Sequence, residues 1–276
     1  MKFFTLIALF VGLLPAGGIQ KTPITVTFIA NCGFLLEGGG QKILFDLQEP
    51  DKKAGSPEKP SAGELLKADL PPFNDIPVIL ISHSHADHLG VTAVLQYLGR
   101  HPKTRLYSTD DTRAELQKAD PAAYERVRVQ INVLDPHSGG PVTLKLDGHT
   151  LETIGTWHAG APQYQFKTLC FNLNFQGRVI LYLSDIDPGY EKNLPVLRTW
   201  KAGHAEIDLL FAPDAAIYES PYSSEAGREF IRSLKARHIV PMHINPKDFE
   251  TAAGKVRAFY PDALLFRESL EKKIID

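Results

Sequence analysis

Cysteine is scarce in this sequence, and basic residues are not in surplus. Only two of the 276 residues are cysteines, Cys32 and Cys170, so at most one intramolecular disulfide can form. The 30 basic and 32 acidic residues give a formal net charge of −2, without the basic surplus that nucleic-acid-binding proteins normally carry. Glycine and proline, at 21 and 20 residues, are too few for a low-complexity chain. We therefore expect no nucleic-acid partner and no long disordered region.

The remaining composition is that of an ordinary globular protein. Hydrophobic residues make up 43% of the chain and charged residues 22%. A chain of this length buries about three quarters of its unfolded surface, so it can hold a preformed active site without covalent cross-links. The two cysteines are consistent either with one disulfide or with two separate, half-buried thiols.

The N-terminus has the pattern of a signal peptide. Met1 and Lys2 precede an apolar stretch over residues 3–14, which small residues at 16–18 follow. This stretch is too short to cross a hydrocarbon core of ~30 Å as a helix, but it suits the apolar region of a signal peptide. A buried first helix would not explain why the three features occur together. We predict a signal peptide over 1–18, a single domain over 19–276 without a transmembrane segment, and a secreted or periplasmic location.

Strand patterns outnumber helix patterns early in the chain and alternate with them later. Such an order predicts α/β layers with helices outside a β core. The polar, proline-rich stretch 50–75 is expected to be a loop or flap. Strict alternation of valine or isoleucine with polar residues predicts a half-buried strand over 126–133. The other predicted strands are 24–29, 42–46, 77–82, 152–157, 168–175, 178–184, 208–213 and 238–242, and the predicted helices are 91–98, 223–236 and 246–260.

Potential metal ligands are concentrated directly after the apolar strand 77–82. The chain there reads HSHADH, which places His83, His85, Asp87 and His88 within six residues. Neutral imidazole nitrogens and a carboxylate oxygen suit zinc and similar divalent metals. Asp87 and His88 are adjacent and must point in different directions, so the motif favours two metal positions. A solvated polar loop would seldom contain three histidines so close together.

The HSHADH motif resembles the H-x-H-x-D-H hallmark of the metallo-β-lactamase-fold hydrolase superfamily. Three further residues follow predicted strands in the order that the resemblance requires: His158, Asp185 and His243. The similarity extends over residues 24–246. It implies a four-layer αββα sandwich whose site lies at the shared edge of two sheets. Within the superfamily, the opening segment 24–46 looks most like the lactonase and N-acylphosphatidylethanolamine phospholipase D-like branch.

The resemblance also implies a role for each ligand. One metal would be held by His83, His85 and His158, and a second by Asp87, His88 and His243. Asp185 would bridge the two metals, because one carboxylate has two oxygens and neighbouring cations need negative charge between them. A hydroxide bridging the metals would attack the substrate, with Asp87 in a catalytic role that orients it. We expect two divalent ions, zinc first, with manganese and iron as alternatives.

Several residues outside the predicted ligand set have possible supporting roles. Asp46 either orients a ligating imidazole from behind the site or caps a turn. Asp214, Tyr218 and Tyr222 follow the strand 208–213 and are candidates to line the pocket. Ser184 stands where the superfamily usually has glycine, immediately before the bridging aspartate. The remaining histidines are interpreted as surface or structural residues: His101, His137, His149, His204 and His238.

The resemblance defines the reaction class better than the substrate. True β-lactamases lack an aspartate at the bridging position, so Asp185 argues against antibiotic hydrolysis. We predict an exported metal-dependent hydrolase of an ester, lactone or phosphodiester, acting on a small-molecule or lipid-like substrate. One alternative is an iron-dependent, oxygen-using enzyme of the same fold, similar to sulfur dioxygenases. Diiron members usually have glutamate where His85 stands, which counts against that form. Another alternative is a catalytically silent metal-binding protein.

Overall fold

Two β-sheets form the centre of the protein. The structure is a computed structural model that describes residues 21–49, 60–146, 148–160, 166–204 and 206–276, so the predicted signal peptide lies outside the described residues. Among these residues, one sheet has the spatial order β13-β1-β2-β3-β4-β5-β6 and the other β12-β11-β10-β9-β8-β7. The first comprises β1 (Ile24–Ala30), β2 (Gly33–Gly38), β3 (Gln41–Phe45), β4 (Val78–Leu80), β5 (Arg105–Ser108), β6 (Ile131–Val133) and β13 (Lys272–Ile275). The second comprises β7 (Val142–Leu146), β8 (His149–Trp157), β9 (Lys167–Phe175), β10 (Arg178–Tyr182), β11 (Leu209–Pro213) and β12 (His238–Met242).

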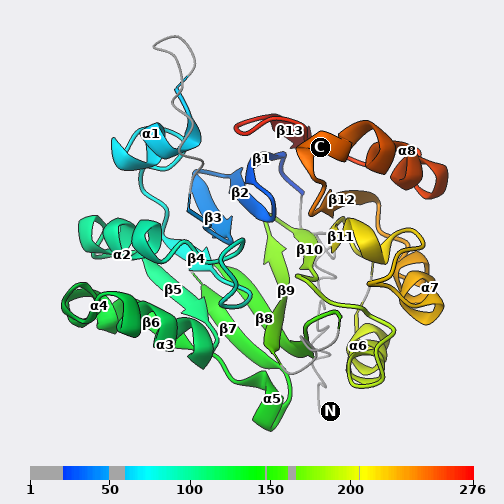
Figure 1. The fold of residues 1–276 in the computed structure, drawn as a ribbon, viewed down its shortest axis with the longest axis horizontal. Coiled ribbons are helices and arrows are strands. Elements are labelled where there is room, and N and C mark those ends of the chain that lie inside the picture. Colours follow the sequence, from blue (N-terminus) through cyan, green and yellow to red (C-terminus); the bar gives the residue numbers. More distant parts are fainter. Residues whose placement is uncertain (1–20, 50–59, 147, 161–165, 205) are drawn as a thin grey trace, which may run out of the picture.

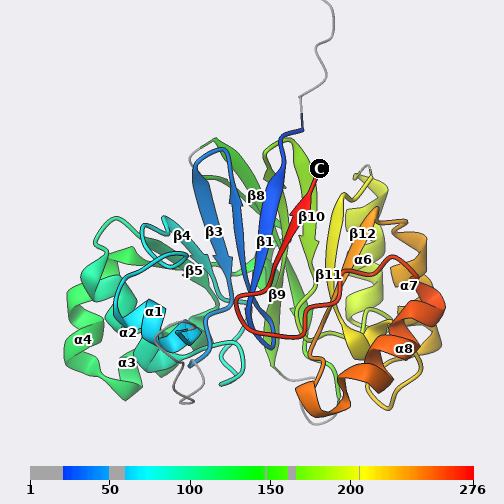
Figure 2. The ribbon, with the colours of Figure 1, turned by 90° about the horizontal axis from the view of Figure 1, so that it is seen from above.

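Helices cover the outer face of each sheet (Figures 1 and 2). The first sheet is covered by α1 (Ala62–Lys67), α2 (Val91–Arg100), α3 (Asp110–Ala119) and α4 (Pro121–Val127). The second is covered by α6 (Asn193–Ala202), α7 (Glu225–Ser233) and α8 (Phe249–Phe259), and the short α5 (Pro136–Gly139) precedes β7. The predicted four-layer αββα sandwich is confirmed. Among the described residues, no helix has the length and apolar character needed to cross a membrane.

Aromatic side chains fill the space between the sheets. Phe45 stacks on Tyr182 with ring centroids 4.9 Å apart, and Phe171 and Phe211 pack around them. Alternate residues of β9 face this core, as the sequence predicts, while Cys170 faces the apolar layer beneath the helices. Cys32 lies in the inter-sheet core, so the two cysteines are separate, buried thiols and not a disulfide.

Strand direction explains why the candidate ligands meet. In the first sheet, β3 to β6 are parallel neighbours. In the second, β10, β11 and β12 are parallel, and β8 runs in the direction of β10 because both are antiparallel to β9. The segments after β4, β8, β10 and β12 therefore leave the sheets at one edge, where ligands commonly bind in such folds.

Two predicted elements differ from the structure. Over 126–133, only the last three residues form a strand, β6, because Asp120 caps α4 ahead of Pro121 at its first position, and a 3-10 turn follows at Arg128–Gln130. Val129 is consequently 73% exposed. Within the stretch predicted as a loop, residues 62–67 form α1. Ser61 and Glu64 cap this helix reciprocally, a signal present in the sequence.

Candidate metal centre

The HSHADH loop is fixed by short backbone contacts. After β4, the amides of His88 and Leu89 both donate to the carbonyl of His85, which folds the loop into a turn. The amide of Gly90 donates to the Leu47 carbonyl at 2.6 Å and anchors the end of the loop beside the segment after β3. A Cβ at Gly90 would lie 2.3 Å from the Glu49 amide nitrogen, so only glycine fits this approach. The loop's imidazoles are thus held before any ligand binds.

His83, His85 and His158 form the first group of candidate ligands. The His83 and His158 ring centroids lie 5.1 Å apart, and each is 4.6 Å from that of His85. The Nδ1 of His158 contacts the Ala159 carbonyl at 2.7 Å, and the Nδ1 of His83 contacts the Ser82 hydroxyl at 3.1 Å. The Nε2 atoms of His83 and His158 are buried without a hydrogen-bond partner. Convergent imidazole nitrogens are donors that suit a divalent metal.

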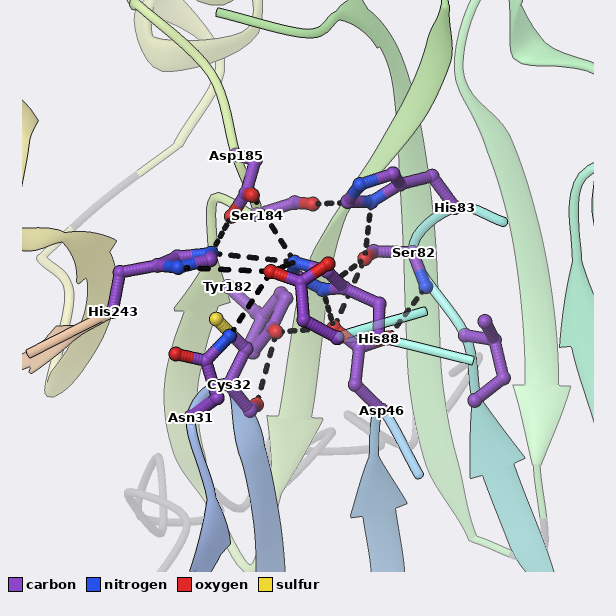
Figure 3. A network of polar contacts seen from close by, with 12 residues as sticks. Asn31, Cys32, Asp46, Ser82, His83, His88, Tyr182, Ser184, Asp185 and His243 are labelled. Atoms are coloured by element: carbon purple, nitrogen blue, oxygen red, sulfur yellow. Dashed lines mark hydrogen bonds and ion pairs between the residues drawn. The ribbon is translucent and has the colours of Figure 1, made fainter. Parts of the chain in front are cut away.

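Cys32, His88, Asp185 and His243 form the second group, with ligand atoms within 4.8 Å of one another. The Nε2 of His88 lies 3.3 Å from the Nε2 of His243. Asp185 Oδ1 is 2.5 Å from that His243 nitrogen, and Oδ2 is 3.1 Å from His88 Nε2. Figure 3 shows these four side chains around a common point.

Asp185 lies between the two groups. Its Oδ2 is 3.5 Å from the Nε2 of His158, in addition to its contacts with the second group. Ser184, directly before it, adopts a φ of +55°, a conformation that glycine adopts more easily. Ser184 therefore occupies a backbone conformation that suits glycine, and its hydroxyl lies 3.4 Å from the Nδ1 of His83.

Asp46 fixes the orientation of the His88 imidazole through its Nδ1 atom. Its Oδ2 accepts the Nδ1 proton of His88 at 2.6 Å and the hydroxyl proton of Tyr182 at 2.5 Å, and Oδ1 accepts the amide of Ser82 at 2.7 Å. Asp46 is fully buried, and Figure 3 shows its contacts with Ser82, His88 and Tyr182. Of the two predicted roles, the structure supports orientation of an imidazole. The contact leaves Nε2 of His88 facing the second group.

Asp87 lies at the rim and outside both groups. Its side chain is 47% exposed, and its Oδ2 is 3.9 Å from both the Nε2 of His88 and the Nδ1 of His243. Asn31 donates to the same oxygen at 3.2 Å. The structure thus brings six of the seven predicted ligands into the two groups, and in place of Asp87 it brings in Cys32. Cys32 lies in the bend directly after β1, and no sequence motif marks it as a ligand.

The electrostatics of the two groups differ. Burial lowers the pKa of His83 and His85, and neighbouring imidazoles lower it further, so both are neutral and their nitrogens can bind a metal. Burial also opposes the charged form of His88, but Asp185, Cys32 and Asp46 together raise its pKa well above the usual value. Burial alone would raise the pKa of Asp185, yet His88 and His243 hold it well below its usual range. The second group therefore favours positive charge.

The other predicted residues lie around this centre or away from it. The Tyr218 hydroxyl donates to Asp214 at 2.5 Å, and burial raises the pKa of that carboxyl. Tyr222 is 62% exposed and has no described contact with either group. The five histidines interpreted as surface or structural lie outside both groups of the described chain. His101 pairs with Asp69 at 3.0 Å, and His204 with Glu152 at 2.8 Å.

Comparison with known proteins assigns the family. A family model described as "Beta-lactamase superfamily domain" matches residues 56–244. The chain belongs to this superfamily. A relative from Aeropyrum pernix, named a UPF0173 metal-dependent hydrolase, is 32% identical over 260 residues, which cover 91% of this chain and 90% of the relative. A protein of the same name from Pelotomaculum thermopropionicum is 24% identical over 261 residues, 89% of this chain and 99% of its own length.

Two solved structures have a similar fold. The metallo-β-lactamase fold protein YhfI from Bacillus subtilis has a TM-score of 0.60 at 14% identity and covers 92% of this chain and all of its own. The metallo hydrolase Igni18 from Ignicoccus hospitalis has a TM-score of 0.58 at 16% identity over 92% of this chain and 99% of its own. This β-lactamase superfamily member is a metal-dependent hydrolase, and its described residues form two groups that could hold metal ions.

Proposed function

We propose that the protein is an exported, dinuclear metal-dependent hydrolase that cleaves an ester, lactone or phosphodiester. The position of Asp185 supports this proposal most directly. One oxygen of its carboxylate faces the second group, and the other approaches both His88 and His158. A carboxylate placed between two sets of imidazoles is suited to bridging two cations.

His83, His85 and His158 would hold one cation, and His88 and His243 the other, with Asp185 shared. Zinc is the first candidate for both, because imidazole-rich sites with a carboxylate suit it, and manganese and iron are the alternatives. Such cations supply a water nucleophile that is active near neutral pH and stabilise negative charge that develops on the substrate.

The chain's own residues orient the reactants. Asp87 is the exposed carboxylate nearest to His88 and His243, and Asn31 holds one of its oxygens. From this rim, Asp87 is placed to orient an attacking water and to accept its proton. Asp46 and Ser82, buried behind the site, keep the imidazoles of His88 and His83 in a fixed direction.

The surroundings favour an organic substrate with an apolar part. Phe166 is 43% exposed, and its ring centroid lies 4.9 Å from that of His85. An exposed aromatic ring beside a ligand group offers an apolar surface to a small-molecule or lipid-like substrate. The net charge of −2 gives no support to a nucleic-acid substrate. Activity like that of the lactonase and N-acylphosphatidylethanolamine phospholipase D-like branch fits this surface.

Elemental analysis and a substrate panel test the proposal together. Protein purified without added metal should contain two equivalents of a divalent cation and should hydrolyse at least one of a phosphodiester, a lactone and a thioester. Asp185→Ala and His243→Ala should abolish turnover while the circular dichroism spectrum is kept. His238→Ala, at the other end of the strand that precedes His243, is the matched control. Undiminished activity of either site variant would contradict the assignment.

Export is tested separately. Expression of the full chain in a bacterial host should release a product that begins after residue 18, as N-terminal sequencing would show. An uncleaved product that is retained in the cytoplasm would contradict export and leave the hydrolase proposal intact.

A further inference from the structure

We propose that Cys32 is a sulfur ligand of the second cation and completes a four-donor site with His88, His243 and Asp185. This inference rests on the proposed two-cation centre. It assigns a ligand that the superfamily motif does not contain. It also separates the roles of two residues, since Cys32 would bind metal and Asp87 would stay at the rim without binding it.

The sulfur of Cys32 lies beside three predicted metal ligands. The Sγ atom of Cys32 lies within 4.8 Å of the ligand atoms of His88, Asp185 and His243, and the residue is fully buried. Figure 3 shows the sulfur on the side of His88 on which His243 lies. Three of the four donors are thus the residues that superfamily resemblance assigns to metal binding. The fourth comes from a different part of the chain, the bend between β1 and β2.

Buried hydrogen bonds hold the backbone of Cys32 in a fixed position relative to the second group. The Tyr182 hydroxyl contacts the Cys32 carbonyl at 3.1 Å and the Asp46 carboxylate at 2.5 Å. Since Asp46 also holds the Nδ1 of His88, a single hydroxyl links the bend that contains the thiol to the carboxylate that orients the imidazole. The cysteine is therefore fixed relative to His88 by buried polar contacts.

Cys170 shows what a purely structural thiol in this protein looks like. It is also fully buried, but its Sγ donates to the Leu183 carbonyl at 3.1 Å and packs in the apolar layer beneath the helices. Burial raises the pKa of the Cys170 thiol to about 12. Candidate ligand atoms gather around Cys32 and none of the described ones gather around Cys170.

The donor set has a chemical consequence. One sulfur, two imidazole nitrogens and one carboxylate oxygen form a set of four that suits tetrahedral zinc. A cysteine that binds zinc or cobalt does so as the thiolate, and thiolate ligands disfavour manganese and magnesium. The second position should therefore prefer zinc over manganese, and replacement of Cys32 by serine should reduce this preference.

Cobalt substitution tests the sulfur ligand directly. Protein freed of metal by a chelator and loaded with cobalt(II) should bind two equivalents and show a near-ultraviolet thiolate-to-cobalt charge-transfer band. Cys32→Ser should lose this band, and Cys170→Ser should keep it. X-ray absorption of the zinc-loaded wild-type protein should show a sulfur neighbour at about 2.3 Å. The absorption measurement needs no variant, so it decides the matter even if Cys32→Ser fails to fold.

The outcomes separate this inference from the proposed function. Two equivalents of cobalt without the band, or with a band that persists in Cys32→Ser, would overturn the sulfur ligand and leave the two-cation centre standing. One equivalent with a band lost in Cys32→Ser would support the sulfur ligand and contradict the two-cation centre. One equivalent without a band would overturn both.

Discussion

The Nδ1 of His88 donates a proton to Oδ2 of Asp46 at 2.6 Å, and both side chains are fully buried. This contact links the end of β3 to the HSHADH loop after β4. Asp46 adopts a φ of +45°, an uncommon conformation for a non-glycine residue, which indicates that the surrounding contacts hold it in place. The carboxylate thus fixes which nitrogen of His88 faces the second ligand group.

Asp46→Asn should weaken metal binding without replacing any ligand. The amide keeps the size of the side chain, but it cannot accept from the Ser82 amide, the Tyr182 hydroxyl and His88 at once. Loss of such an orienting contact lowers metal affinity on the order of 10–100-fold. A competition titration against a chromophoric chelator measures the change.

Tyr182→Phe is the control for Asp46→Asn. It removes one hydroxyl that contacts the same carboxylate but leaves the His88 contact in place. Its metal affinity should fall less than that of Asp46→Asn, because the contact that orients His88 remains and only the hydroxyl that also holds the Cys32 carbonyl is lost. Equal losses in both variants would mean that the network acts through general stability and not through His88.

In the metal-free protein, pH should change the stability contributed by His83 and the stability contributed by His243 in opposite directions. Burial lowers the pKa of His83, so the stability that its neutral form contributes is present above about 6.5 and lost as the pH falls below it. Burial opposes charge on His243 as well, but Cys32 and Asp185 raise its pKa. Its contribution is fully present below about 6.5 and is lost as the pH rises through the raised pKa.

Urea denaturation of chelator-treated variants measures this difference. Relative to wild type, His83→Asn should lose more free energy of unfolding at alkaline than at acidic pH, and His243→Asn should lose more at acidic pH. Asparagine tolerates the φ of +65° at position 243, so the backbone is not the cause of a change there. Parallel pH profiles for the two variants would contradict the assigned pKa directions.

Six of the seven predicted ligands lie in the two groups, and the rule that brings them together is geometric. The superfamily resemblance implies further ligands at the ends of later strands, and His158, Asp185 and His243 follow such strands in order; strands that run in the same direction end at one edge of a sheet. Cys32 follows β1, whose strand pattern carries no indication that the bend after it reaches the second group. Its inclusion depends on how the two sheets pack, which periodicity along one strand does not reveal.

The error at 126–133 has a local cause. Alternating apolar residues satisfy the strand pattern, but Asp120 and Pro121 start helix α4, which includes the first two residues of the segment. A capping residue and a proline at the first helical position act over one turn and outweigh the alternation. The missed helix α1 has the same origin, since Ser61 and Glu64 cap it inside a stretch whose composition indicates a loop.

Ser184→Gly should stabilise the protein. A non-glycine residue at a φ of +55° is strained, and glycine relieves about 1 kcal/mol of this strain. The contact that is lost, from the hydroxyl to the Nδ1 of His83, is long at 3.4 Å. Ser184→Ala keeps the strain and loses the same hydroxyl, so it should be no more stable than wild type. Thermal unfolding of the two variants compares them, and equal shifts would assign the effect to the hydroxyl.

Gly90→Ala should destabilise the protein and weaken metal binding together. The added Cβ would lie 2.3 Å from the Glu49 amide nitrogen, which is backbone and has little room to move. Relief requires the segment at Leu47 to separate from the end of the HSHADH loop, where the Gly90 amide now donates at 2.6 Å. Overpacking of this kind costs about 1–3 kcal/mol. Urea denaturation and chelator competition measure the two effects.

Gly99→Ala is the matched control on the helix that Gly90 begins. Gly99 lies inside α2, and a Cβ there would meet no atom within 4 Å. Alanine in an open helical position should stabilise the protein by about 0.5–1 kcal/mol, because glycine loses more conformational freedom on folding. The two glycine-to-alanine changes should therefore have opposite signs, although both act on one helix. A loss of stability in both would mean that α2 tolerates no added methyl group, and the close approach at Gly90 would not be the cause.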